Sequence, residues 1–137
     1  MLESQFSKWI VKQLTDLGCH CQRVEVTTGS GVPDLNACWL PPEDLSATTD
    51  PKEFWIELKV SKTTKVHLRK YQKPWLQKRK DFGGLVFVMC YHERSGFIST
   101  WDDFSSSWSS QGHLLTGEPM QIEEKNKKFV ELFLQNL

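Results

Sequence analysis

The stretch EFWIELKV, residues 53–60, decides the fold of this chain. Apolar residues occupy positions 54, 56, 58 and 60, and the positions between them carry Trp55, Glu57 and Lys59. Because successive side chains of a β-strand point to opposite faces of a sheet, this alternation predicts a strand with one apolar face. The other face then brings Glu57 and Lys59 side by side.

The segment that precedes this strand predicts its antiparallel partner. Residues 32–39, VPDLNACW, alternate in the same way, and Pro33, which lacks a backbone N–H, belongs at the start of the strand. Asp34 is therefore expected at the beginning of a strand that pairs with the strand of Glu57. The intervening residues 41–52 contain three prolines and show no periodicity, which is typical of a long hairpin connection or a flexible excursion.

Two further elements are predicted on the N-terminal side. In residues 3–17 apolar side chains recur every three or four positions, which predicts a helix with an apolar stripe. Gly18 is expected to end this helix as a C-cap glycine. Residues 22–27 alternate and are rich in β-branched side chains, so they predict a strand.

The C-terminal side predicts two helices and two strands. Residues 68–80 predict a helix, in which Pro74 implies a kink or a late start. The continuous apolar run at 85–90 is typical of a strand buried on both faces. A short strand is expected over residues 96–101 and a closing helix over residues 123–137.

This order of elements predicts an α/β fold in which helices flank a mixed central sheet of about five strands. A length of 137 residues fits a single domain, residues 1–137, with its own core. The 39% hydrophobic and 25% charged residues exclude a disordered chain. No apolar run is long enough to span a membrane, and no signal peptide is recognisable. We therefore expect a cytoplasmic protein without a membrane partner, whose four cysteines are thiols.

The formal net charge of zero hides an uneven distribution of charge. Residues 61–80 contain eight of the 17 lysines and arginines and no aspartate or glutamate. A solvated helix face usually mixes both signs, so a run of one sign indicates contact with a polyanion such as nucleic acid. The candidate DNA-binding residues in this segment are Lys62, Lys65, His67, Arg69, Lys70, Lys73, Lys78 and Arg79.

The candidate site consists of Asp34, Glu57 and Lys59, which the two paired strands bring together. Two adjacent carboxylates repel each other, and a hard divalent cation with oxygen ligands relieves that repulsion. A lysine beside such a cation can hold a water molecule and stabilise charge that develops on a phosphate. The same three residues also fit a cross-strand salt bridge of Lys59 with either carboxylate, and the short pattern alone leaves both interpretations open.

Three stretches carry a resemblance to a known family. They are Gly31-Val32-Pro33-Asp34-Leu35, then Glu57-Leu58-Lys59, and then Gln72-Lys73-Pro74-Trp75, followed by Gly83-Gly84 before an apolar strand. Together they resemble the PD-(D/E)XK nuclease superfamily, whose domain is restriction-endonuclease-like. Their spacing is most similar to the VRR-NUC-type and phage Holliday junction resolvase-like nucleases. The resemblance extends from Glu3 to about Val88.

The resemblance implies a role for each residue of the motif. Asp34 and Glu57 would bind the metal, Mg²⁺ or Mn²⁺, together with the backbone carbonyl of Leu58. Lys59 would orient or activate the attacking water. Gln72 on the following helix would support the site or contact the cleaved strand.

A third carboxylate is expected near this pair. The resemblance matches this residue to Glu3 on the first helix, which would reach a second metal or act through water. Glu25, on a strand near Gly31, is the competing residue, and the geometry of the helix face favours Glu3. The chain departs from the family pattern in the 22 residues between Asp34 and Glu57, which contain three prolines. Pro74 also fits poorly in the helix that carries Gln72.

The function that follows from the resemblance is a Mg²⁺- or Mn²⁺-dependent DNA endonuclease that selects branched DNA, a Holliday junction resolvase. Symmetric cleavage of two strands requires two active sites, which implies a homodimer. The compact chain is compatible with a phage protein, which would act in the host cytoplasm. The alternatives are a repair, flap or restriction-type nuclease of the same superfamily and a non-catalytic DNA-binding module.

Several other features predict no further chemistry. Cys19-His20-Cys21 lacks the second ligand pair that a structural zinc site requires, so buried thiols are expected. No glycine-rich phosphate loop followed by Lys and Ser or Thr occurs, so no nucleotide cofactor is expected. Trp55 shares a strand face with Glu57, where it would shield the site or stack on a base. Trp101 and Trp108 are candidates for a dimer surface.

Overall fold

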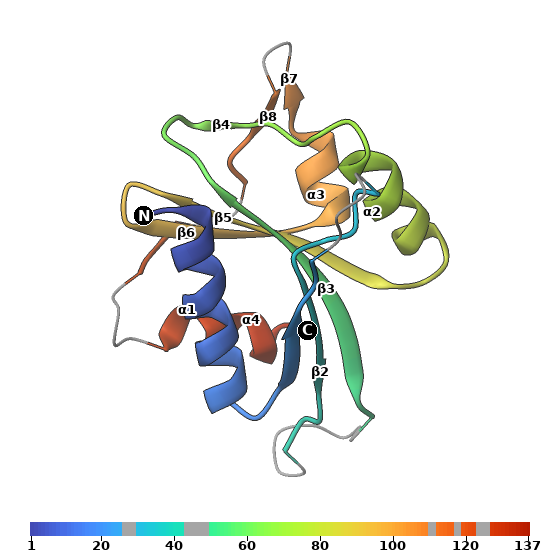
Figure 1. The fold of residues 1–137 in the computed structure, drawn as a ribbon, viewed down its shortest axis with the longest axis vertical. Helices are drawn as coiled ribbons and strands as arrows, with labels where there is room; N and C mark the ends of the chain where they lie inside the picture. Colours follow the sequence, from blue (N-terminus) through green and yellow to red (C-terminus); the bar gives the residue numbers. More distant parts are fainter. Residues whose placement is uncertain (26–29, 43–49, 110–111, 117–118, 123–126) are drawn as a thin grey trace.

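The computed structural model describes residues 1–25, 30–42, 50–109, 112–116, 119–122 and 127–137. The helices are α1 (Glu3–Asp16), α2 (Gln72–Asp81), α3 (Trp101–Ser106) and α4 (Lys128–Gln135). The strands are β1 (His20–Arg23), β2 (Leu35–Trp39), β3 (Lys52–Val60), β4 (Lys65–Val66), β5 (Leu85–His92), β6 (Ser95–Thr100), β7 (Trp108–Ser109), β8 (Gly112–Leu114) and β9 (Met120–Gln121). Figure 1 shows their arrangement.

The main sheet is mixed, as the sequence predicts. Its six strands follow the order β1-β2-β3-β5-β6-β9. The central pair β3–β5 is parallel, and the other neighbours are antiparallel. The α2 helix lies between β3 and β5 in the chain, because parallel strands need a crossover connection. The sixth strand, β9, has only two residues, too few to produce a readable alternation.

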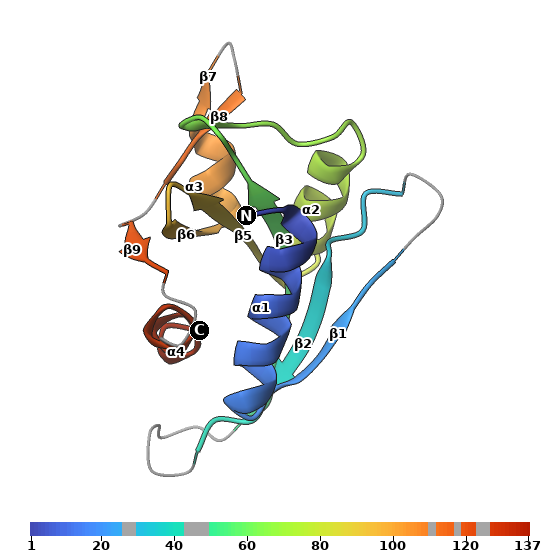
Figure 2. The ribbon, with the colours of Figure 1, turned by 60° about the vertical axis from the view of Figure 1, so that its left-hand side comes forward.

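Helices cover the two faces of this sheet in separate pairs. α1 and α4 lie on one face, and α2 and α3 lie on the other (Figures 1 and 2). The alternation of β5 explains this arrangement, since Phe87 and Met89 contact the core under α1 and α4, whereas Val86, Val88 and Cys90 belong to the core under α2 and α3. The prediction of a strand buried on both faces is thus confirmed.

Most predicted elements occur, but several boundaries differ. α1 ends at Asp16, and Gly18 follows in the left-handed conformation with φ +94°, as expected of a glycine after a helix. The strand predicted over 22–27 begins earlier, at His20, and ends at Arg23, so Val24 and Glu25 lie beyond it. The last two positions of the prediction lie outside the described residues. Residues 43–49 of the predicted connection also lie outside them.

The helix predicted from residue 68 begins only at Gln72. Pro74 therefore lies in the first turn, where its missing N–H would have no partner within the helix, and the late start removes the conflict that the sequence presented. Tyr71, the residue before the helix, is 54% exposed. Residues 68–71 are not helical, and β4 ends before them, at Val66. β4 joins β8 and β7 in a small second sheet that the sequence did not predict.

The closing helix is shorter than predicted in the part that the structure describes. It begins at Lys128, and residues 123–126 lie outside the described part. Its buried face consists of Phe129, Val130, Phe133 and Leu134, whereas Leu132 is 42% exposed. None of the helices described is long and apolar enough to cross a lipid bilayer.

Candidate active site

The pairing of β2 with β3 brings Asp34 and Glu57 together. Leu35 lies opposite Ile56 in this antiparallel register, so Asp34, the residue before β2, lies across from Glu57. The backbone N–H of Leu58 donates a hydrogen bond to Asp34 Oδ2 over 2.8 Å. This bond fixes the Asp34 carboxylate beside the strand that carries Glu57.

Glu57 is buried in the sheet face under α2, with only 2% of its surface exposed. Its Oε1 accepts a hydrogen bond of 2.8 Å from Gln72 Nε2 and lies 3.7 Å from Lys59 Nζ. The Arg69 N–H donates to Gln72 Oε1 over 2.6 Å, which turns the amide nitrogen of Gln72 toward Glu57. Glu57 Oε2 is buried and has no hydrogen-bond partner among the described residues.

Burial raises the pKa of Glu57 from 4.5 to about 9. The negative charge of Asp34 adds to this rise, and Lys59 opposes it. A hydrogen bond to Asp34, which only a protonated Glu57 can donate, raises the pKa further, and Glu3 adds a smaller contribution. A buried carboxylate with one unpartnered oxygen is unfavourable unless a cation or a proton neutralises it. The oxygen atoms of Asp34 and Glu57, with the carbonyl of Leu58, are a donor set that suits Mg²⁺ or Mn²⁺.

Without a divalent cation, the free energy of unfolding is expected to fall as the pH rises. Glu57 keeps its proton up to a pKa of about 9 in the folded chain but loses it near 4.5 in the unfolded chain, so the folded state binds more protons between these values. The slope is at most about 1.4 kcal/mol per pH unit for this group. Chemical denaturation in EDTA at several pH values measures the slope.

The matched comparison for this pH dependence is Glu57→Gln, which has no proton to lose. We expect the variant to flatten the part of the stability profile that Glu57 causes, so that its advantage over the wild type grows as the pH rises. Equal profiles for the two proteins would contradict the assignment.

Gly31 explains how the start of α2 approaches Asp34. Its φ of +77° belongs to the left-handed region, which favours glycine. A Cβ built on Gly31 would overlap the carbonyl group of Tyr71 and would lie 2.9 Å from the backbone nitrogen of Gln72. The segment that leads to Asp34 therefore packs directly against the helix start that carries Gln72, and a side chain would separate the two.

Glu3 and Glu25, the two candidates for a third carboxylate, line the same pocket of about 210 Å³ as Asp34 and Leu58. Glu25 lies 3.8 Å from Arg23 across an exposed ion pair. Within the described ranges, no three His, Cys, Asp or Glu side chains form a group that could hold a metal ion. The described centre therefore comprises two carboxylates, and the role of Glu3 stays a prediction.

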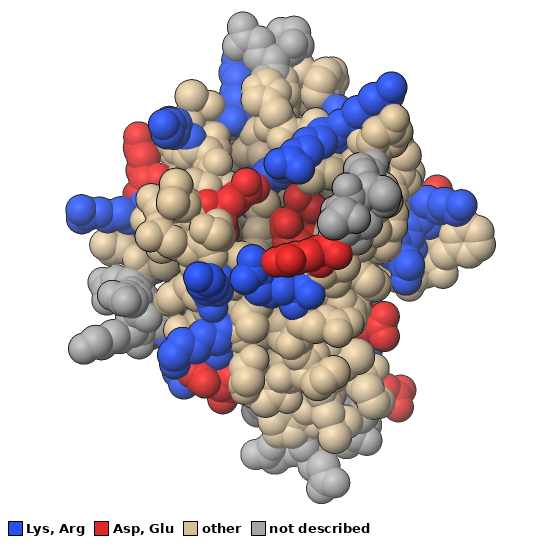
Figure 3. All heavy atoms as spheres, in the orientation of Figure 1, with Lys and Arg blue, Asp and Glu red and all other residues tan. Residues whose placement is uncertain are grey.

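The predicted DNA-binding residues lie mostly at the surface. In Figure 3 acidic side chains lie in a hollow near the middle of the face, and Lys and Arg side chains gather around it. Most of the eight residues are exposed, and Lys65 and Lys73 are half-buried. Lys80 at the end of the same segment is paired with Asp102 at 2.8 Å. The Arg79 guanidinium lies 5.2 Å from the ring of Trp55 and 4.7 Å from that of Trp75.

Trp101 has a different role from the one expected, whereas the role of Trp55 stays a prediction. Trp101 is only 3% exposed and donates its indole N–H to Gln77 over 2.7 Å, so its place in a dimer surface was wrong. Trp101 belongs to the core cluster formed by apolar residues of α3 and β5, and these apolar residues in the sequence could have indicated a core position. The ring of Trp55 contacts that of Trp75, with 5.1 Å between their centroids.

The cysteines lie where burial keeps them as thiols. Burial raises the pKa of Cys19 to about 12 and that of Cys21 to about 11. Cys90 lies in the core under α2 and α3, where burial raises its pKa to about 12. All four cysteines are free, and their pKa values disfavour the thiolate that a zinc site needs.

No family model matches the chain, and no curated protein matches it in sequence. Among solved structures, the chain is similar to Hjc of Archaeoglobus fulgidus, a Holliday junction resolvase from a hyperthermophilic archaeon. The similarity covers 86% of this chain and 94% of that chain, with a TM-score of 0.58 and 15% sequence identity. It establishes the fold, which is a restriction-endonuclease-like α/β architecture with a mixed central sheet flanked by helices.

Proposed function

We propose that the chain is a divalent-metal-dependent DNA endonuclease that cleaves branched DNA, with the four-way junction as its preferred substrate. One observation carries the proposal: the buried Glu57 carboxylate, with an unpartnered oxygen, lies across from Asp34 and next to Lys59. A purely structural salt bridge would satisfy both oxygens of the buried carboxylate. The likeness in fold to a Holliday junction resolvase adds support.

In this proposal each residue of the site has a separate role. Asp34 and Glu57, with the carbonyl of Leu58, hold the cation, which supplies Lewis-acid activation of water and of the phosphate when it is bound. Gln72 holds Glu57 Oε1, so that Oε2 stays available as a ligand. Lys59, whose side chain is 11% exposed, would place its amino group beside the attacking water and the phosphate.

The basic residues of segment 61–80 supply the electrostatic part of DNA binding. Each DNA phosphate that a lysine or arginine side chain neutralises steepens the dependence on salt. The slope of the logarithm of the binding constant against the logarithm of the salt concentration changes by about 0.9 per phosphate. Arg69→Ala is therefore expected to lower that slope by about one and to weaken binding to all DNA structures alike. Filter binding or fluorescence anisotropy at several salt concentrations measures the slope.

The control for Arg69→Ala is Lys12→Ala, which removes the same charge from α1. Lys12 is exposed and paired with Asp16 at 2.9 Å, away from the basic segment. It should leave the slope unchanged. An equal change for both variants would show that only the net charge of the chain matters, contrary to the proposal.

The test of the activity is cleavage of end-labelled DNA with Mg²⁺ or Mn²⁺ and with EDTA. The substrates are an immobile four-way junction, a flap, a linear duplex and a single strand. Paired symmetric cuts in the junction alone are expected, and they require two active sites, which a homodimer would provide. Cleavage of the flap or duplex instead would retain a nuclease and discard the resolvase, whereas metal-independent binding without cleavage would identify a DNA-binding module.

A further inference from the structure

Trp108 on β7 is a large aromatic side chain that remains 58% exposed. β7 pairs with β8, and β8 pairs with β4, so that Trp108, His113 and Val66 form one row across the small sheet. This sheet stands at one end of the molecule beside α3 and close to α2 (Figures 1 and 2). Single exposed aromatics are common on protein surfaces, and what distinguishes this one is how it is held.

The ring of Trp108 is restrained from two sides. Lys73 Nζ lies 3.8 Å from the ring centroid, which is a close cation–π contact. The ring of His113 lies 5.1 Å away in an edge-to-face arrangement, and His113 packs in turn on buried Phe104 at 4.5 Å. The exposed ring is thus fixed in one orientation and backed by the core under α2 and α3, which suits a surface that another ring stacks upon.

The small sheet also gathers positive side chains near the active site. Lys73 directly follows Gln72, whose amide donates to Glu57. Lys65 lies opposite Leu114 in the β4–β8 pair, and the ring of His67 is close to Gly112, where an added Cβ would be 3.0 Å from it. Three of the predicted DNA-binding residues therefore contact the elements that carry Trp108.

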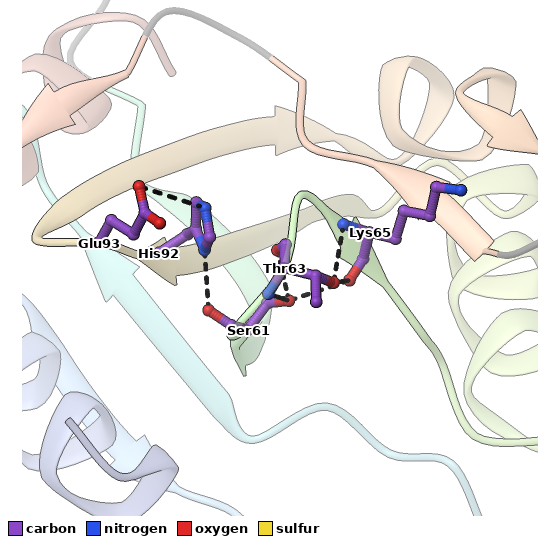
Figure 4. A network of polar contacts seen from close by, with 5 residues as sticks. All are labelled: Ser61, Thr63, Lys65, His92 and Glu93. Atoms are coloured by element: carbon purple, nitrogen blue, oxygen red, sulfur yellow. Dashed lines mark hydrogen bonds and ion pairs between the residues drawn. The ribbon is translucent and has the colours of Figure 1, made fainter.

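The turn that enters this sheet is fixed to the catalytic strand. Figure 4 shows Ser61 and Thr63, whose hydroxyl groups bond to the backbone of Lys65 at the start of β4. His92 Nδ1 donates to the carbonyl oxygen of Ser61 over 3.0 Å. Because Ser61 comes immediately after β3, two residues beyond Lys59, the sheet with Trp108 has a defined position relative to the site.

We propose that Trp108 stacks on an exposed base of the DNA, at the branch point next to the cleaved strand, while Lys65, His67 and Lys73 bind the adjacent phosphates. The inference rests on the proposed function. A continuous duplex covers both faces of each base, whereas a branch point or a single strand leaves base faces open. Stacking is tolerant of sequence, so Trp108 would favour branched DNA without reading its bases. The surrounding positive charge favours DNA over a protein partner.

The test measures DNA binding in EDTA, so that it does not depend on cleavage. The probes are a four-way junction and a linear duplex, each with 2-aminopurine at the corresponding position next to the branch point. Trp108→Leu is expected to weaken junction binding about tenfold and to abolish the quenching of 2-aminopurine that the wild type causes. Trp108→Phe keeps an aromatic ring and should retain most of the junction affinity and most of the quenching.

The salt dependence separates stacking from charge. Trp108→Leu should leave the slope of binding against salt unchanged, whereas Lys73→Met should reduce it. Circular dichroism and the melting temperature check that each variant is folded. If Trp108→Leu proves unstable, Trp108→Phe and Trp108→His, which differ in stacking strength, replace it with the same readouts.

The outcomes distinguish this inference from the proposed function. Wild-type protein that binds and cleaves junctions, with Trp108→Leu unaffected in affinity and quenching, overturns the inference alone. Quenching that Trp108→Leu abolishes, without cleavage in any metal, supports the inference and overturns the nuclease. A change in the sedimentation mass of Trp108→Leu with unchanged DNA affinity would assign the ring to a contact between copies of the chain and overturn the stacking role.

Discussion

Glu57→Gln is expected to reduce DNA cleavage by about 10³-fold or more while it leaves DNA binding nearly unchanged. The glutamine keeps the shape of the side chain but removes the charge that a divalent cation needs opposite Asp34. A loss of about 4 kcal/mol of transition-state stabilisation corresponds to about 10³ in rate. Single-turnover cleavage of a labelled four-way junction in Mg²⁺ measures the rate, and anisotropy in EDTA measures the binding.

The matched control is Glu53→Gln, the same substitution on the same strand. Glu53 is exposed and accepts a weak contact of 3.5 Å from Asn36 Nδ2, near the beginning of β3. The variant Glu53→Gln should cleave the junction at the wild-type rate. If Glu57→Gln cleaved as fast as Glu53→Gln, the buried carboxylate would not belong to the active site.

Gly31→Ala is the second substitution with a large expected effect. The added methyl group would overlap the backbone of Tyr71, so either the segment before Asp34 or the start of α2 must move. The positive φ of Gly31 adds about 1 kcal/mol of strain for any other residue. We expect a loss of at least about 3 kcal/mol in the free energy of unfolding, because backbone cannot yield as a flexible side chain does. Cleavage should fall further, since the movement separates Gln72 from Glu57.

Gly18→Ala provides the control for backbone strain. Gly18 also has a positive φ, +94°, but a Cβ built there meets no atom within 4 Å. Gly18→Ala should lower the free energy of unfolding only by the backbone strain, and it should cleave DNA at the wild-type rate. Urea denaturation and junction cleavage are measured for Gly31→Ala and Gly18→Ala. The difference between the two variants gives the effect of the close approach of Gly31 to Tyr71. Equal losses for both would show that Gly31 does not set the distance between the two segments.

The strands that position the site could be predicted because apolar and polar residues alternate over enough positions to indicate a strand. The eight residues at 53–60 have one register that buries the apolar face, and this fixes the face of Glu57 and Lys59. The pairing of Asp34 with Glu57 followed from the order of the strands, and the structure bears out that pairing. The contact of Gln72 with Glu57 agrees with the supporting role that the family resemblance implied, whereas no periodicity pointed to it.

The small sheet and the contact of Gly31 could not be predicted, for different reasons. β4 and β7 have two residues each, so neither carries an alternation, and β8, the partner of β4, lies far away in the chain. The contact of Gly31 has no signal in the sequence, because a sequence does not show which distant backbone will pass close to a glycine. The late start of α2 was one of two outcomes that Pro74 allowed, and the structure shows which of them occurs.

The most direct test of the central claim is calorimetric titration of Mn²⁺ into the wild type and into the Asp34→Asn/Glu57→Gln double variant at pH 7. A pKa of about 9 means that Glu57 carries a proton at this pH before the ion binds. Repeating the titration in buffers of different ionisation enthalpy should therefore reveal the release of about one proton per wild-type molecule. The account predicts that the wild type binds Mn²⁺ with proton release and that the double variant does not bind it. Equal binding by the two proteins would contradict the assignment of Asp34 and Glu57 as the metal centre.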